Sequence, residues 1–428
     1  MSVPQPSQAQ LAAAGLDRLP LAPESKRLDL ELPPLSNPTE ITNPLFPISE
    51  LESVVFSGKV DDKPFHTETT LLPETRVIEW APGRQVETQV SQYFAYLDGR
   101  IEEVARDYYA QADDGSVWYF GEEVFDYNEL GLVDSTEGSW LAGKHGPPEM
   151  IMPADPQVGD VHRAENIPAI AFEELTIKRT EQTMPGPSGP VEGIMVASEL
   201  HDDGTTSEKV FAPGYGEFFS AHQGDTEAMA LAVPTDAAAG PEPAELEAMS
   251  AASGTVIDAV GAASWEEAAA GAAELNRTWT TYRQSDLPPR IAGELGRGLE
   301  ALGPALEARD QAKAGTAAID VAQSTLDLRL RYQPQAEVDL ARFELWARQI
   351  LVDAAAKDQG GVNGDVATLK WIRDRFADTL EPVELTSVDV HLGNLGESVI
   401  DRDIEAAKEE AAGLLDTLSR AGAPPPRS

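Results

Sequence analysis

Apolar and polar residues alternate with a period close to two from about Leu51 to Phe219. This alternation is typical of β-strands that bury one face. It predicts strands in nine segments: 52–60, 65–72, 75–80, 84–97, 100–111, 116–127, 171–182, 191–200 and 208–219. Asp-Gly pairs at 98–99, 114–115 and 203–204 predict tight hairpins, because this dipeptide readily adopts positive φ. The pattern as a whole predicts an antiparallel meander, interrupted by a Pro/Gly-rich crossover loop at 143–160.

The composition changes to Ala, Leu and Glu after residue 243. Apolar positions then recur with the helical period, which predicts helices at 265–283, 336–356, 365–380 and about 399–420. The sequence Gly-Gly-Val-Asn-Gly at 360–364 predicts a break between two of them. Short loops between helices indicate antiparallel packing. The predicted fold class is therefore α+β: a curved antiparallel sheet, a meander or half-barrel, followed by an antiparallel helical bundle.

The predicted domains follow these changes of pattern. Residues 1–47 are rich in Pro, which fixes φ and removes a backbone donor, so an extended lead-in on or near the first domain is expected. The β domain is predicted at 48–232, a linker at 233–243, the helical bundle at 244–420 and a disordered tail at 421–428. The N-terminus lacks the basic region and the long apolar run of a signal peptide. Because such a lead-in often follows a removed signal or lipid anchor, we expect a trimmed, exported protein.

The charge of the chain argues against several classes of partner. There are 73 acidic and 32 basic residues, and the formal net charge is −41. Such a field repels phosphate backbones and anionic lipid surfaces, so neither nucleic acid nor a membrane surface is an expected partner. No apolar run approaches the roughly 18–20 residues that a membrane span needs. The sequence has no cysteine, which excludes disulfides, thiolate metal sites and cysteine nucleophiles.

One predicted hairpin, at 100–127, combines aromatic and acidic residues. A turn at 114–115 gives these cross-strand pairs: Tyr109 with Phe120, Asp107 with Glu122, and Glu103 with Asp126. One face then carries Tyr109, Trp118 and Phe120 together with those four acids. The other face carries Tyr108 and Tyr119 with Arg106 and Glu123.

The acidic end of the first face is a candidate site. Like charges directly opposite each other on two strands are destabilising, so Asp107 and Glu122 require compensation. Solvent is the simplest source, and a basic residue from a third strand or a bound cation are the alternatives. Asp107 and Glu122 are therefore candidate metal ligands. The rings of Tyr109, Trp118 and Phe120 are candidate ligand-binding residues, with a hydrophobic core as the alternative interpretation.

A second candidate metal site lies between residues 389 and 403. This stretch gathers Asp389, His391 and Asp401. Carboxylates together with a histidine suit calcium or a transition metal. The alternative is a loop followed by the acidic N-terminus of the last helix, where negative charge complements the helix dipole.

Polar residues also repeat along one stripe of the helix predicted at 336–356. Asp339 and Arg342 begin this stripe. The spacing favours a solvated face with i,i+3 ion pairs, and a polar interhelical cleft is the alternative.

The motifs of common enzymes do not occur. Residues 138–144 spell the Gly-x4-Gly-Lys of a phosphate-binding loop, but His145 stands where that loop needs Ser or Thr. Neither Gly-x-Ser-x-Gly nor His-Glu-x-x-His is present. Because no nucleophile with a matching base can be nominated, no catalytic residue is predicted.

Three motifs carry a resemblance: Trp-Tyr-Phe-Gly-Glu at 118–122, Met-Pro-Ala-Asp-Pro at 152–156 and Ala-Pro-Gly-x-Gly at 212–216. With them, the stretch from about Asn43 to Phe219 resembles a group of uncharacterised exported bacterial proteins. The predicted sheet is also similar to the half-barrels of lipoprotein-carrier proteins. The resemblance implies an exported protein with no established activity, and it does not cover the helical half.

These observations predict a secreted or cell-envelope protein that binds without catalysis. Its expected ligand is a small hydrophobic molecule on the curved sheet, or a protein partner. The alternative is a protein that binds a divalent cation, calcium or a transition metal, through carboxylates and histidine. No other cofactor is predicted.

Overall fold

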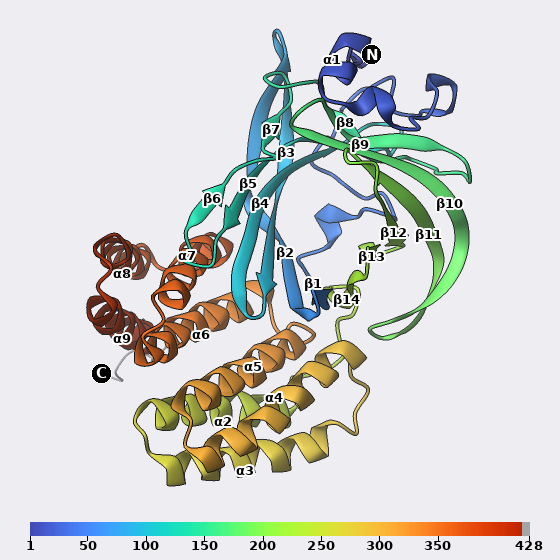
Figure 1. Cartoon of the computed structure of the whole chain (residues 1–428). Helices are drawn as coiled ribbons and strands as arrows, with labels where there is room; N and C mark the ends of the chain where they lie inside the picture. The colour runs from blue at the N-terminus through green and yellow to red at the C-terminus, as the bar shows by residue number, and fades with distance from the viewer. Residues whose placement is uncertain (422–428) are drawn as a thin grey trace. The chain divides into compact units, whose positions relative to one another are not determined.

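The computed structural model describes residues 1–421 and divides into two compact units (Figure 1). The first unit comprises Met1–Asp126 and Val133–Asp236. The second comprises Tyr127–Leu132 and the chain from Ala237 onwards. The predicted tail at 421–428 lies outside the described residues, apart from the backbone of its first residue.

The first unit is built on one antiparallel sheet, which has fourteen strands within residues 1–421 and does not close. The strands are β1 (Ser53–Val60), β2 (Lys63–Ala81), β3 (Arg84–Leu97), β4 (Arg100–Gln111), β5 (Val117–Tyr127), β6 (Val133–Ser135), β7 (Trp140–Leu141), β8 (Glu149–Met152), β9 (Val161–Ile167), β10 (Ala171–Gly186), β11 (Gly189–His201), β12 (Thr206–Ala212), β13 (Gly216–His222) and β14 (Asp225–Val233). Their order is β6-β5-β4-β3-β2-β1-β14-β13-β12-β11-β10-β9, with β7 and β8 paired to β5. Figure 1 shows how strongly the sheet curves.

Local sequence explains much of this topology. Asp98 and Gly99 both have positive φ and form the two-residue turn between β3 and β4, as the Asp-Gly pair predicted. Gly115 and Gly204 also have positive φ in their hairpins. The two halves of the meander are then joined by a non-local pair, because β14 lies beside β1.

Several features of the sheet differ from the sequence prediction, and β6, β7 and β9 were not predicted. The segments 65–72 and 75–80 form one bent strand, β2, and 208–219 is a hairpin of two strands. The predicted crossover loop at 143–160 contains β8, which pairs with β5. Strand β14 was missed because its Ala, Met and Leu residues carry little β-propensity.

The Pro-rich segment before β1 packs on the first unit. It contains α1 (Gln8–Ala13) and the 3-10 turns η1 (Leu16–Arg18), η2 (Glu24–Lys26) and η3 (Ile48–Glu50). Leu32, Ile41 and Phe46 of this segment are buried in the main core of the sheet, with Trp118 and Trp140. The prolines therefore hold an irregular path whose apolar residues cover one part of the sheet.

The second unit is a run of eight α-helices in residues 237–421. They are α2 (Ala244–Gly261), α3 (Trp265–Tyr282), α4 (Pro289–Ala308), α5 (Gln311–Arg329), α6 (Gln335–Ala356), α7 (Gln359–Phe376), α8 (Pro382–Asp401) and α9 (Ile404–Ala421), with a 3-10 turn η4 (Ala377–Thr379). The α+β fold class is thus confirmed. No helix among the described residues combines the length and the apolar character of a membrane-crossing helix.

The predicted break at 360–364 is wrong, because these glycines lie in the first two turns of α7. Asp358 caps that helix by accepting a hydrogen bond from the Gly361 backbone N–H. A side chain at position 361 would collide with the Asp353 carboxylate of α6. Gly361 therefore allows two helices to approach closely, and the glycines do not end a helix.

Candidate functional site

A cavity of about 240 Å³ lies against the curved sheet. Its lining comes from the segment before β1, from β1–β4 and from β12–β14. The lining residues are Phe46, Ile48, Leu51, Val54, Phe56, Thr67, Thr69, Ser91, Tyr93, Asp107, Tyr109, Lys209, Tyr215, Gly216, Glu217 and Glu227. Half of them are aromatic or aliphatic, and four are charged. The whole cavity belongs to the first unit.

Strand register explains why these residues meet. Thr69 of β2 lies opposite Val54 of β1 on one side and opposite Tyr93 of β3 on the other. Ser91, two residues before Tyr93, lies opposite Asp107 of β4. Because side chains alternate along each strand and cross-strand pairs share a face, this part of the cavity wall is one continuous surface.

Lys209 is the only basic residue of the lining, and its charge is already matched. Its ammonium lies 3.0 Å from a carboxylate oxygen of Glu217 and 4.0 Å from one of Glu199. Burial disfavours the charged ammonium, but the surrounding carboxylates, Glu199 and Glu217 first, raise the pKa of Lys209 well above its ordinary value. Lys209 therefore stays protonated and neutralises its own partners.

Asp107 and Glu122 lie opposite each other, as predicted; Asp107 is buried and Glu122 is partly buried. Burial raises the pKa of Asp107 to about 7, although the Tyr119 hydroxyl donates a hydrogen bond to it at 2.6 Å. Burial, the charge of Glu165 and a hydrogen bond with Glu165 raise the pKa of Glu122 well above its ordinary value. Protonation of Asp107 and Glu122 thus relieves part of the repulsion between their two negative charges.

Two further carboxyl groups on this side have similarly raised pKa values. Burial, reinforced by the charge of Glu217, raises the pKa of Glu227 to about 7, while Lys209 opposes this effect. Burial and the charges of Asp126 and Asp107 raise the pKa of Glu103 to about 7. Near neutral pH each of these two carboxyl groups is therefore present in both its protonated and its ionised form.

The predicted aromatic face is wrong in part. A β-bulge between Asp107 and Tyr109 places Tyr109 opposite Tyr119 instead of Phe120, and the two tyrosine rings stack at 4.7 Å. Tyr109 and Asp107 line the cavity, whereas Trp118 and Phe120 are fully buried in the core and do not. Glu122 is not part of the lining either.

A different group of side chains satisfies the geometry of a metal site within the first unit. Ligand atoms of Glu173, Glu199 and His201 lie within 4.8 Å of one another. Burial opposes ionisation of Glu199, but Lys209 and the Ser207 hydroxyl more than offset it and lower the pKa of Glu199. Burial and the charge of Glu199 raise the pKa of Glu173 well above its ordinary value. The two carboxyl groups therefore share a proton, which a metal ion would have to displace.

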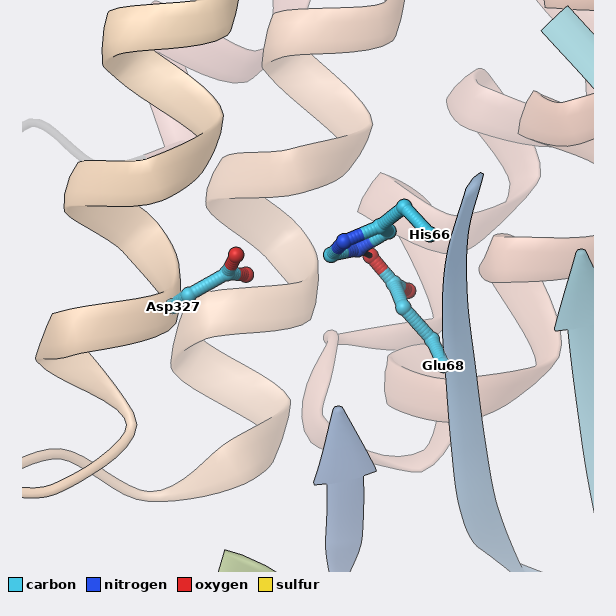
Figure 2. A group of neighbouring side chains, drawn as sticks. All are labelled: His66, Glu68 and Asp327. Atoms are coloured by element: carbon cyan, nitrogen blue, oxygen red, sulfur yellow. Dashed lines mark ion pairs between the residues drawn. The ribbon is translucent and has the colours of Figure 1, made fainter. Parts of the chain in front are cut away.

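His66 and Glu68 form a smaller pair on β2 (Figure 2). The His66 Nε2 atom lies 3.5 Å from a Glu68 carboxylate oxygen. Asp327, which Figure 2 also draws, belongs to helix α5 of the other unit and forms an ion pair there with Arg342. Two ligands from one strand do not make a metal centre by themselves.

The predicted site at 389–403 has a different structure from the expected loop. Asp389, His391 and Asp401 all lie in the continuous helix α8. Asp389 binds the Arg373 guanidinium at 2.9 and 3.0 Å, and the two ring nitrogens of His391 contact Glu410 and Thr417. Asp401 lies twelve residues after Asp389, about 18 Å along the helix axis. Asp389 and His391 thus have other partners, and Asp401 lies too far along the helix to share a metal ion with Asp389.

The stripe at Asp339 and Arg342 is buried, so the prediction of a solvated face is wrong for these two residues. Arg342 binds Asp327 of α5 at 2.7 Å and Asp339 at 3.2 Å, and Arg375 of α7 also reaches Asp339. All four side chains are at most 1% exposed. They form a buried ion network that connects three helices of the second unit.

Sequence reasoning missed the residues that complete the cavity, Lys209, Glu217 and Glu227. They lie more than 80 positions after Tyr109 and reach it only through the pairing of β14 with β1. The alternation along β12 and β13 places Lys209 and Glu217 within predicted strands but does not show which residues they face. No protein-family model matches this chain, and comparison with curated proteins gives no match.

Proposed function

We propose that this chain is a non-catalytic binding protein that holds a small, partly apolar ligand in the cavity of its curved sheet. The observation that carries the proposal is the cavity itself, about 240 Å³, with a lining that is half aromatic or aliphatic. Ligand sites in proteins are concave and mostly apolar, with a few polar groups that fix orientation. An engineered apolar cavity of about 150 Å³ holds benzene, so this one accommodates a ring with a short substituent.

The proposal places the protein outside the cytoplasm, secreted or in the cell envelope. The resemblance of residues 43–219 to exported bacterial proteins supports this location. A binding protein in such a place meets its ligand directly from the surroundings.

Native mass spectrometry of the full chain, purified without detergent or chelator, tests the binding proposal. We expect the protein to carry a small co-purified mass. The variant Thr69→Trp fills the cavity from β2 and should lose that mass. Thr75→Trp lies on the same strand but is exposed, and should keep it. Equal spectra from the two variants would contradict the proposal.

A second candidate function is cation binding, favoured by the group of Glu173, Glu199 and His201. One nitrogen and two carboxylate ligands suit a transition metal better than calcium. Elemental analysis of the purified protein should then show one metal equivalent that is lost in Glu199→Gln. A metal content below one tenth of an equivalent, after purification in the presence of zinc or manganese, would exclude this candidate.

A further inference from the structure

The charges around the cavity do not balance. Three carboxyl groups line it, Asp107, Glu217 and Glu227, against the single ammonium of Lys209. Lys209 lies 3.0 Å from Glu217, which accounts for one of the three. Among the described residues, Asp107 accepts a hydrogen bond only from a neutral hydroxyl, that of Tyr119. Within residues 1–421, no hydrogen bond or ion pair joins the Glu227 carboxylate to another residue.

Two hydroxyl groups of the lining have no partner within the described residues. Thr67 and Ser91 are 1% and 2% exposed. Neither hydroxyl forms a hydrogen bond with another residue of the described chain, although both line the cavity. Neither hydroxyl oxygen is among the fully buried side-chain atoms that lack a partner, so both are accessible from the cavity. A hydroxyl donates and accepts, so the two positions can each bind a polar group of a ligand.

The rings of the lining supply a further attraction for positive charge. Phe46, Tyr93, Tyr109 and Tyr215 all contribute to the cavity wall. Phe46 packs edge-on against Tyr109, with ring centroids 5.1 Å apart. A cation over the face of an aromatic ring is attracted by the ring quadrupole, most strongly where water is excluded. An anion gains nothing from these faces and is repelled by the carboxylates.

From these three observations we propose that the ligand of the cavity is an organic ammonium ion carried on a ring or short apolar chain. Its ammonium group pairs with Asp107 and Glu227, and its apolar part occupies the space among the aromatic side chains. This inference rests on the proposed binding function and names the chemical class of the ligand. A bare inorganic cation would satisfy the carboxylates but would leave the apolar lining without contacts.

Three probes of nearly equal shape separate charge from size: 2-phenylethylamine, 2-phenylethanol and phenylacetate. We expect calorimetric titration of the full chain at pH 8 to show that the amine binds at least about tenfold more tightly than the alcohol. Phenylacetate should bind more weakly than both. Amine binding should also weaken as salt is raised, because its ionic part is screened. Equal affinities for the amine and the alcohol would overturn the inference.

Substitutions identify the groups responsible. Asp107→Asn combined with Glu227→Gln should bring the affinities for amine and alcohol within about twofold of each other, since both ionic partners are removed. Asp202→Asn, in an exposed turn, should leave the preference unchanged. Each cavity substitution removes a buried charge and should therefore not destabilise the fold. Unfolding then does not explain a loss of binding, and circular dichroism checks that the variants are folded. A preference for the amine that survives in the double variant would also overturn the inference.

Failure of this inference differs from failure of the proposed function. If the alcohol binds the parent chain and not Thr69→Trp, the cavity is a ligand site whatever the charge preference. If calcium chloride competes with the amine and itself binds more tightly, the inference is wrong and the cation is inorganic. If no probe binds and no mass co-purifies, both the inference and the proposed function fail.

Discussion

Replacing Asp107 with Asn should stabilise the first unit, and more so at pH 8 than at pH 5. Asp107 is 8% exposed, and burial raises the pKa of its carboxyl group from 3.8 to about 7, with Glu165 adding to the effect. The folded chain therefore keeps a proton that the unfolded chain has released. The contribution of Asp107 to the free energy of unfolding falls as the pH rises from about 4 to about 7, and the loss is complete above that range. Asparagine cannot ionise and keeps an oxygen that accepts the Tyr119 hydrogen bond.

The shift of about three pKa units corresponds to roughly 4 kcal/mol at pH 8, at about 1.4 kcal/mol per unit. At pH 5 only about one unit of the pKa shift contributes, or roughly 1–2 kcal/mol. Asp107→Asn should therefore raise the free energy of unfolding by about 2–4 kcal/mol at pH 8 and by about 1–2 kcal/mol at pH 5. The gain should grow with pH, which is opposite to the behaviour of a salt-bridged aspartate.

Urea unfolding followed by hydrogen exchange of β4 and β5 peptides measures this difference in the first unit alone. Asp202→Asn, the same change in an exposed turn, is the control and should alter stability by less than about 0.5 kcal/mol at either pH. A loss of stability in Asp107→Asn at pH 8 would refute the reasoning. It would mean that the ionised carboxylate has a favourable partner in the folded protein.

Three further predictions concern other parts of the chain, each checked by urea unfolding. Arg342→Met should cost about 3–5 kcal/mol because the buried carboxylates of Asp327 and Asp339 lose the guanidinium that they share, although Arg375 still reaches Asp339. Arg348→Met, at the partly exposed ion pair with Asp258, should cost about 1 kcal/mol or less. Glu149→Gln should be nearly neutral at pH 5 and increasingly stabilising as the pH rises to 9, because burial raises the pKa of this fully buried carboxyl well above its ordinary value. Gly143→Ala should cost about 2–4 kcal/mol, since its φ is +82° and a methyl group there would meet a backbone carbonyl of β2. Gly83→Ala is its control: φ is +69° but the space is open, so only about 1 kcal/mol of backbone strain is expected.

Periodicity predicted the two kinds of unit and most strands because it reports local burial, which each residue experiences through its own neighbours. The pair of Asp107 and Glu122 was predicted correctly for the same reason, since a single hairpin determines it. The bulge next to Asp107 was not visible, because one extra residue in a strand leaves the composition unchanged. Because of this extra residue, Tyr109 lies opposite Tyr119 and not opposite Phe120.

The rest of the candidate site depends on long-range pairing, which alternation cannot supply. Glu227 reaches the cavity on β14, a strand that the sequence did not indicate, and Lys209 reaches it on β12. The burial of Asp339 and Arg342 was missed for a related reason. A helical stripe of polar residues is the same whether it faces water or the ion-paired side chains of two other helices.

The acidic residues behind the net charge of −41 should favour cations over anions both at the surface and in the cavity, but for different physical reasons. At the surface, salt screens the acidic residues, and they act mainly by repelling polyanions. In the cavity, less water solvates the buried Asp107 and the partly buried Glu227, and burial raises the pKa of each carboxyl group to about 7. A neutral ligand would leave both groups to take up protons, and an anionic ligand would add a third negative charge to them. The proposed ammonium ion would replace those protons with a positive charge that also contacts the aromatic wall. On this proposal, charge more than apolar area would select the ligand of the cavity.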